Sequence, residues 1–294
     1  SVVVVSLAVI LYLSIDKFNG TMQSRAVMLA TGIFSIIVTV MQQAGAISLL
    51  AIDWVRPFNG VLRALSLVTF DLDVVNIGCI AKLEPMADFT TKVLVLLAGV
   101  IVISLVHLVV VALRHNMQFR SRLPTLIVSV GTVTTMFLLS VVTTVTGPLQ
   151  CQSHPNQAWT VRSYPSVVCW DSDTHDAMVA IAAVALVAVL GYVVGIVYVV
   201  SQYIHRVNKG DMEFLASFNF LFFRFHPHCY WYVLVQTIRS LFFALTNIIP
   251  EPMMTILAMQ LVSQVSALLI IRVLPWRAAA ANALDLMGSL GILL

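Results

Sequence analysis

Two cysteines in the longest polar stretch of an otherwise apolar chain are the first candidates for chemistry. Cys151 and Cys169 lie in the segment 151–176, which reads CQSHPNQAWTVRSYPSVVCWDSDTHD. A disulfide between two such cysteines persists only on the oxidising side of a membrane. The pair therefore predicts that this loop faces the outside or a lumen, and alternation then assigns a side to every other loop.

Three other arrangements of the thiols are open. Cys79 falls on the same side in this topology and competes for either partner, or all the thiols stay free. With His154 and His175, the loop also offers the two-cysteine, two-histidine set that zinc accepts, without the close C-x₂-C or H-x₃-H spacing of zinc sites. We expect a disulfide between Cys151 and Cys169, and no metal.

Two opposite charges lie inside apolar runs. Arg239 is in the middle of the run 229–249, and Asp285 is in the last run. A charge at the bilayer centre costs about 3 kcal/mol or more unless it is paired or hydrated. Counted from the inner ends of their runs, the two residues differ in depth by only about 3 Å. We expect them to pair and so to join two helices; the alternative is that they line a pathway or a proton relay.

Other polar side chains also fall at membrane depth. His107, in the run 91–113, fits a hydrogen-bonded core residue better than a relay. The remaining ones are amides and a hydroxyl: Gln42, Gln43, Gln236, Gln260, Ser263 and Gln264. If the chain is a channel, Gln42, Gln260 and Gln264 should share a water-accessible route.

Motifs of catalysis and cofactor binding are missing from the sequence. It has no Gly-rich phosphate loop, no H-E-x-x-H and no nucleophile elbow. We therefore expect no enzyme activity and no cofactor. The partners we expect are the lipid bilayer and other membrane or extracellular subunits, and no nucleic acid.

Composition sets the fold class. The 294 residues are 60% hydrophobic and 10% charged, with a mean hydropathy of +0.98, whereas soluble domains carry roughly 25% charged residues. A helical span needs about 20 apolar residues, and the runs lack the alternation of barrel strands. The sequence predicts an all-α bundle of about eight transmembrane helices, at 1–16, 26–54, 91–113, 125–147, 177–204, 229–249, 253–274 and 278–294.

Residues 1–294 form one transmembrane domain in this interpretation. The chain opens on SVVVVSLAVILYLSI and closes on LDLMGSLGILL, both within apolar runs, so we expect an excerpt of a longer chain. Two outer loops are expected, at 55–90 and 148–176. Within the first, residues 56–80 are too apolar for a free loop and too interrupted for a span, which favours an interfacial or re-entrant segment.

An amphipathic segment is expected on the inner side, at residues 211–228. Its phenylalanines recur at four- and three-residue spacing, which places them on one helical face. They are Phe214, Phe218, Phe222 and Phe225. This face should lie on lipid or on the bundle, with Glu213 and Arg224 toward water.

The distribution of basic residues agrees with the side given by the cysteines. Ten lie in or beside the inner loops: Lys17, Arg25, Arg114, Arg120, Arg122, Arg206, Lys209, Arg224, Arg272 and Arg277. Five lie in outer segments: Arg56, Arg63, Lys82, Lys92 and Arg162. This is the direction of the positive-inside rule, and it predicts an N-terminus outside.

The second half of the chain resembles a known family. The matching features are Phe214 to Phe225, Tyr230-Trp231-Tyr232, Arg239, Gln260, Pro275-Trp276, Asn282 and Asp285, with the outer-loop sequence Tyr164 to Trp170 and His175. They resemble the TRP-like polytopic membrane region of fungal, oomycete and protist proteins, which often follows ephrin-receptor-like cysteine-rich repeats. That family often has an acid directly after the Trp, where this chain has Tyr232.

The resemblance implies a TRP-like channel or transporter-type domain with ion transport as its activity, in the plasma membrane or its ciliary or flagellar extension. The alternative is a membrane anchor or receptor module for a large extracellular cysteine-rich protein. No filter-like glycine motif interrupts a span, so the sequence leaves both functions open.

Overall fold

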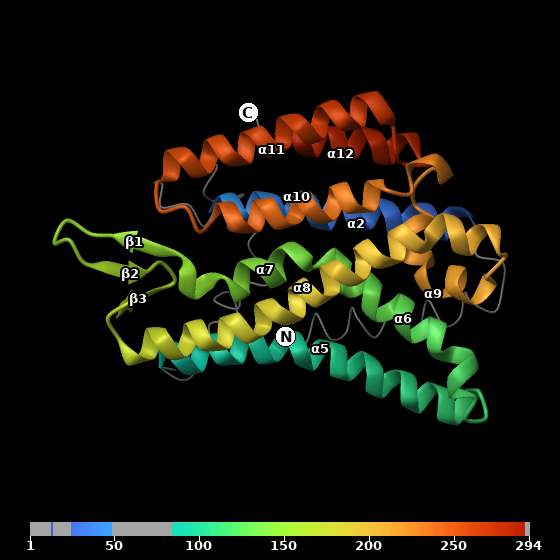
Figure 1. Ribbon diagram of the computed structural model, residues 1–294, viewed down its shortest axis with the longest axis horizontal. Helices are drawn as coiled ribbons and strands as arrows, with labels where there is room; N and C mark the ends of the chain where they lie inside the picture. The colour runs from blue at the N-terminus through green and yellow to red at the C-terminus, as the bar shows by residue number, and fades with distance from the viewer. Residues whose placement is uncertain (1–12, 14–24, 49–83, 292–294) are drawn as a thin grey trace.

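The described part of the chain is mostly helical, and its long helices run lengthwise through the bundle at differing tilts (Figure 1). The computed structural model describes residue 13 and residues 25–48 and 84–291. The helices are α2 (Arg25–Ser48), α5 (Pro85–Arg114), α6 (Phe119–Met136), α7 (Leu138–Val145), α8 (Asp173–Asn208), α9 (Met212–Phe222), α10 (Tyr232–Thr246), α11 (Pro252–Val273) and α12 (Ala279–Gly291). Two 3₁₀ turns, η2 (Gly147–Leu149) and η3 (Pro227–Cys229), and three strands, β1 (Cys151–Ser153), β2 (Trp159–Val161) and β3 (Tyr164–Val168), complete the described elements.

The predicted number of eight spans is supported only in part. Within the described residues, α5, α8 and α11 are long and apolar enough to cross a membrane, and the bent pair α6–α7 makes a fourth candidate. Helices α10 and α12 have 15 and 13 residues, fewer than the roughly 20 that a span needs. The run 1–16 lies outside the described residues, apart from residue 13.

Three helices begin several residues earlier than expected, and one of them is α6, which starts at Phe119 and not at residue 125. α5 starts at Pro85, inside the expected outer loop 55–90, because proline fits the first helical position and Asp88 favours the first turn. α8 starts at Asp173, where the Ser172 side chain accepts a hydrogen bond from the His175 N–H. Residues 49–83, with Cys79 and the expected re-entrant segment 56–80, lie outside the described residues.

The expected span 125–147 is broken. α6 ends at Met136 and α7 begins at Leu138, and the two helices are bent by 62°. Just before the break, the hydroxyls of Thr135 and Tyr192 share a 2.6 Å hydrogen bond, and their oxygens lie 2.6 and 3.1 Å from the Gly131 carbonyl oxygen, which accepts from the hydroxyl whose proton is not used between the two. Side chains that insert into a helix's own hydrogen-bond ladder are a known cause of kinks, and they account for this one.

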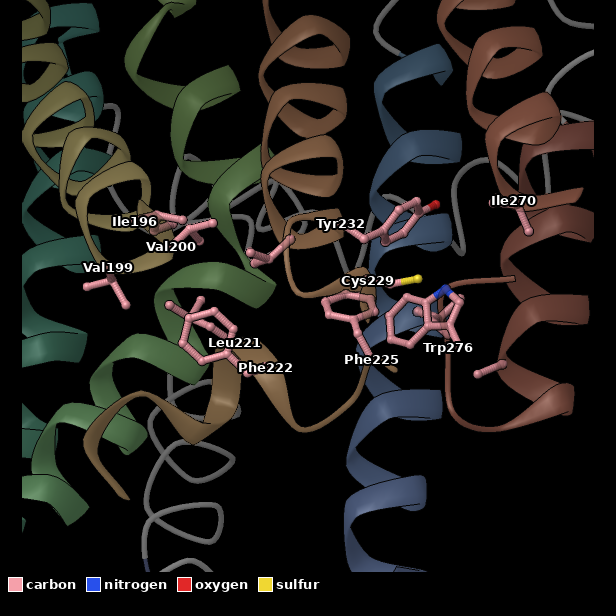
Figure 2. Close-up of a cluster of buried hydrophobic side chains, with 13 residues drawn as sticks. Ile196, Val199, Val200, Leu221, Phe222, Phe225, Cys229, Tyr232, Ile270 and Trp276 are labelled. Carbon is pink, nitrogen blue, oxygen red and sulfur yellow. The ribbon is translucent and has the colours of Figure 1, made fainter. Parts of the chain in front are cut away.

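An aromatic core closes the end of the bundle that carries α9 (Figure 2). Phe225 follows the end of α9 and forms an isolated antiparallel bridge with Trp276, and both side chains are buried. Phe222 is buried too, while Phe214 and Phe218 pack partly buried against the same core. The expected phenylalanine face therefore lies on the bundle, although the helix stops before Phe225.

Arg224 does not point to water as expected. The Arg224 side chain is half-buried. Its guanidinium donates to the Ser35 hydroxyl at 3.2 Å and lies 5.5 Å from the centre of the Phe225 ring. Desolvation lowers its pKa to about 10. The expectation was wrong because the chain turns after Phe222, and this turn carries Arg224 back against α2. Glu213 is exposed, as expected.

Helices α2 and α12 pack at close range. A Cβ atom added at Gly288 would collide with the Val40 side chain, so only glycine permits this approach. The contact brings α12, the last described helix, against α2, the first.

The substitution Gly288→Ala should lower the free energy of unfolding by about 1–3 kcal/mol, because the added methyl meets a β-branched side chain that rotates poorly. Gly191→Ala is the matched control, since the space around Gly191 in α8 is open. Thermal unfolding of the purified chain in detergent measures both. Equal midpoints for the two variants would contradict the close packing.

Candidate functional site

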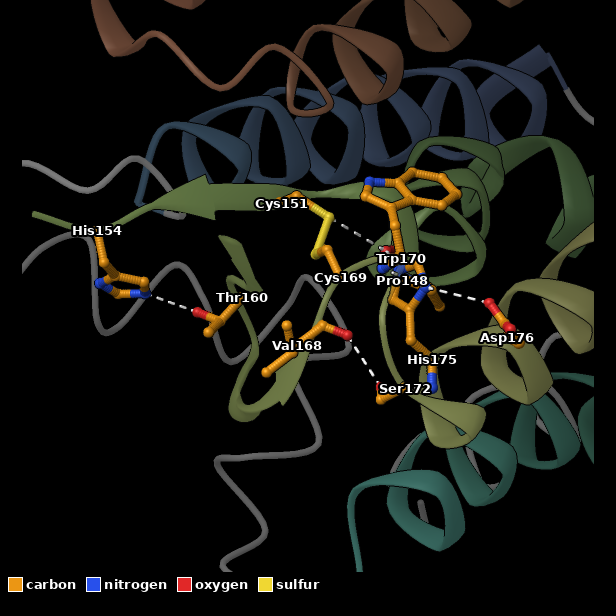
Figure 3. Close-up of a disulfide and its surroundings, with 10 residues drawn as sticks. All are labelled: Pro148, Cys151, His154, Thr160, Val168, Cys169, Trp170, Ser172, His175 and Asp176. Carbon is orange, nitrogen blue, oxygen red and sulfur yellow. Dashed lines mark hydrogen bonds and ion pairs between the residues drawn. A yellow bond between two sulfur atoms is a disulfide. The ribbon is translucent and has the colours of Figure 1, made fainter. Parts of the chain in front are cut away.

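The outer polar segment folds into a small antiparallel sheet fastened by a disulfide (Figure 3). The strand order is β1-β2-β3, and Cys151 pairs with Val161 in the register of β1 and β2. The predicted disulfide between Cys151 and Cys169 is present and links the start of β1 to the residue after β3. Most of the expected loop 148–176 therefore forms this disulfide-linked three-stranded sheet, called the hairpin below, at one end of the bundle, opposite α9 (Figure 1).

His175 anchors this hairpin to α8. One ring nitrogen of His175 and the sulfur atoms of Cys151 and Cys169 all lie within 4.8 Å of one another. Both sulfurs are joined to each other, and both ring nitrogens of His175 are occupied. Nδ1 accepts from the Trp170 N–H at 3.2 Å, so Nε2 carries the proton and donates to the Pro148 carbonyl at 3.1 Å. The cluster fastens the hairpin and has no free ligand atom for zinc.

Two further contacts fix the hairpin on the helices. Arg162 reaches the carbonyl oxygens of Asn247 and Ile249, at 3.4 and 3.5 Å, just after α10, and desolvation lowers its pKa. On the other side, the Tyr164 hydroxyl donates to Asp88 at 2.7 Å. Burial, followed by this hydrogen bond, raises the pKa of Tyr164.

The expected contact between Arg239 and Asp285 is present. The Arg239 Nη1 and Asp285 Oδ1 atoms are 2.8 Å apart, and the two side chains are 5% and 1% exposed. The other carboxylate oxygen, Oδ2, accepts from the Trp276 indole N–H at 2.9 Å and from the Tyr232 hydroxyl at 3.4 Å. The pair therefore joins α10 to α12 and to the turn between α11 and α12.

Sequence reasoning missed Trp276 and Tyr232 as partners of the carboxylate. Both residues appear among the features of the family resemblance, but nothing in their spacing points to Asp285. The usable signal is chemical, because a buried Trp N–H or Tyr O–H almost always finds an acceptor. Asn282, one turn before Asp285, holds the Trp276 backbone through both of its amide atoms.

A separate cavity, with both polar and apolar residues in its lining, lies between α2, α5, α7 and the hairpin. It has a volume of about 80 Å³ and is lined by Gln42, Gly45, Ala46, Phe89, Lys92, Leu139, Ser140, Thr143, Thr144, Gly147, Gln150, Ser163 and Tyr164. Gln42 and Ser140 are 0% and 2% exposed. Four buried atoms of this lining have no hydrogen-bond partner in the described part of the chain. They are the amide nitrogen and oxygen of Gln42 and the hydroxyl oxygens of Ser140 and Thr143. Buried polar groups left in this way normally bind water, an ion or a ligand.

The other expected site residues do not line this cavity. His107 is buried on α5. On α11, Gln260 is partly exposed and Gln264 is exposed. Of the three glutamines expected to share a route, only Gln42 therefore contributes to the cavity.

The fold and composition define a class of protein, namely a helical protein associated with membranes. Comparisons with protein family models, with curated proteins and with solved structures find no match.

Removal of the carboxylate in Asp285→Ala should lower the free energy of unfolding by about 3–5 kcal/mol, because it leaves a buried guanidinium without its counter-charge. Ser289→Ala is the control: it removes a 3.5 Å contact with the same Arg239 atom and the 2.9 Å hydrogen bond from the Ser289 hydroxyl to the Asp285 backbone carbonyl, leaves the charge pair intact, and should cost less than about 1.5 kcal/mol. Unfolding of the purified chain by a denaturing detergent measures both.

In the same assay, Arg239→Gln should restore part of the stability that Asp285→Ala loses, since the double variant buries no unpaired charge. An Asp285→Ala variant as stable as Ser289→Ala would contradict the clamp.

Proposed function

We propose that the chain is a multi-pass membrane domain of the channel or transporter type, TRP-like in character, in the plasma membrane or its ciliary or flagellar extension. One observation carries the proposal: the cavity between α2, α5 and α7 is lined by buried amide and hydroxyl groups that have no partner in the described residues. A membrane protein that only holds a chain in lipid has no need for such groups, because each one costs free energy when it is buried unsatisfied.

The broken span beside the cavity supports the same function. The α7 residues Leu139, Ser140, Thr143 and Thr144 form one wall of the cavity, directly after the 62° bend. Interrupted backbone at membrane depth is tolerated where it is buried in protein or lines a water-filled space. Discontinuous helices of this kind form the solute sites of many transporters.

The proposed orientation places the hairpin outside and α9 inside, with the N-terminus outside. The two elements lie at opposite ends of the bundle (Figure 1), and the disulfide suits an oxidising compartment. The resemblance of residues 214–285 to the TRP-like region adds the expectation of ion transport.

A flux assay tests the function. The chain reconstituted in liposomes should carry ions or small solutes faster than empty liposomes, and Gln42→Leu should reduce the rate several-fold by removing the buried amide. Gln43→Leu, at a neighbouring buried position outside the cavity, should keep the rate. Flux absent from a folded, disulfide-bonded chain, or equal in the two variants, would reject the cavity as the pathway.

The second candidate is an anchor or receptor module for a large extracellular protein. The hairpin favours it, because this rigid element exposes Trp170 by 65% and Trp159 by 42%. Exposed aromatic residues on a fixed scaffold are common in recognition surfaces. A chain without flux that binds an extracellular partner through these tryptophans would establish this function instead.

A further inference from the structure

The unpartnered groups of the cavity can supply several hydrogen-bond donors. The Gln42 amide offers two N–H bonds, and the Ser140 and Thr143 hydroxyls offer one each. Among these three described groups the Gln42 carbonyl oxygen only accepts, and the two hydroxyls can accept as well as donate. Their four N–H and O–H bonds together suit a ligand with negative charge or exposed lone pairs.

The charged side chain of the lining is positive, which also suits a negatively charged ligand. Lys92 is the one charged side chain among the described residues that line the cavity. Its counter-ion, Asp88, is 2.9 Å away but does not line the cavity, and its side chain is 28% exposed against 13% for Lys92. The Asp88 oxygen that faces Lys92 also accepts from the Tyr164 hydroxyl, which holds this carboxylate at the rim. The Lys92 ammonium is therefore the charge that the described lining presents to the cavity, and Asp88 offsets part of it from outside the lining.

The size of the cavity limits the ligand. About 80 Å³ holds a few water-sized particles, since one water molecule needs roughly 10–15 Å³ on this measure. A drug-sized ligand needs roughly 300–1,000 Å³. The site thus fits a small inorganic ion with a remnant of its hydration shell.

Cations suit the lining poorly. Hard cations such as Ca²⁺ and Mg²⁺ bind carboxylate and carbonyl oxygens, and no carboxylate is among the described lining residues. The Thr143 carbonyl oxygen is already engaged by Thr146 and Gln150. Lys92 would repel a cation, whereas a small anion gains from the ammonium, the amide and both hydroxyls together.

We propose that the cavity between α2, α5 and α7 binds a small monovalent inorganic anion, with chloride as the probe. The role of this anion as a transported solute rests on the proposed function, whereas its binding in the cavity does not. The Gln42 amide and the Ser140 and Thr143 hydroxyls donate to the anion, and the Lys92 ammonium balances its charge.

Thermal unfolding of the full chain in chloride-free detergent buffer tests the proposal. At constant ionic strength, replacement of sodium gluconate by sodium chloride should raise the unfolding midpoint saturably, by roughly 2–8 °C. Choline chloride should act equally, because the anion carries the effect. Binding of radiolabelled chloride to the purified chain gives the stoichiometry directly.

Variants locate the site. Gln42→Leu and Ser140→Ala should each weaken chloride binding at least tenfold, and Lys92→Met should abolish it. Gln43→Leu and Lys209→Met, a buried amide and an exposed ammonium outside the cavity, should leave it unchanged. If Lys92→Met fails to fold, Ser140→Ala decides, since it removes one hydroxyl and no charge.

Each other outcome is decisive. Stabilisation that follows sodium and not chloride, stabilisation by an uncharged solute such as glycerol alone, or equal binding by Gln42→Leu and Gln43→Leu would overturn the anion site. Chloride binding without flux supports the site and rejects transport. Cation-selective flux without chloride binding supports the transport domain and rejects the anion.

Discussion

The ion pair between Arg239 and Asp285 holds together the half of the bundle that carries the C-terminal helices. In an apolar surrounding an isolated charge is costly, so each partner restricts the positions that the other can take. Asp285 also accepts from Trp276 and Tyr232, which fixes the turn before α12. Trp276 in turn bridges to Phe225, and the segment after α9 is thereby tied to the same carboxylate. One buried acid thus determines where α10, α12 and the end of α9 meet.

The walls of the cavity depend indirectly on this arrangement. α2 supplies Gln42, and it is held by α12 through the contact between Gly288 and Val40 and by Arg224 through Ser35. α7 supplies the facing hydroxyls, and it packs on α10. The ion pair joins α10 to α12. The two walls, α7 and α2, therefore each pack against a helix of the same joined pair. A polar cavity in a bundle needs such support, since its own lining contributes little packing.

What the sequence reveals and what it hides follow from the range of the interactions. The pairing of Arg239 with Asp285 is predictable, because depth in a membrane is a one-dimensional coordinate that can be counted from the helix ends. The disulfide is predictable from two cysteines in one polar loop. The break before α7 is not, since no proline or glycine marks it and its cause is a contact between Thr135 and Tyr192, which are 57 positions apart. The same holds for the burial of Arg224 and for the cavity, whose residues come from four separate segments.

The length of α8 has a consequence for the bilayer itself. The helix has 36 residues, and its residues 177–204 carry no charged side chain, which gives an apolar stretch of roughly 40 Å at about 1.5 Å per residue. The hydrocarbon core of a typical bilayer is only about 30 Å thick. Where such a helix crosses a bilayer, the mismatch is relieved by tilt or by local thickening of the lipid. The thickness of a bilayer that α8 crosses would therefore act on the tilt of this helix, independently of any ligand in the interior of the protein.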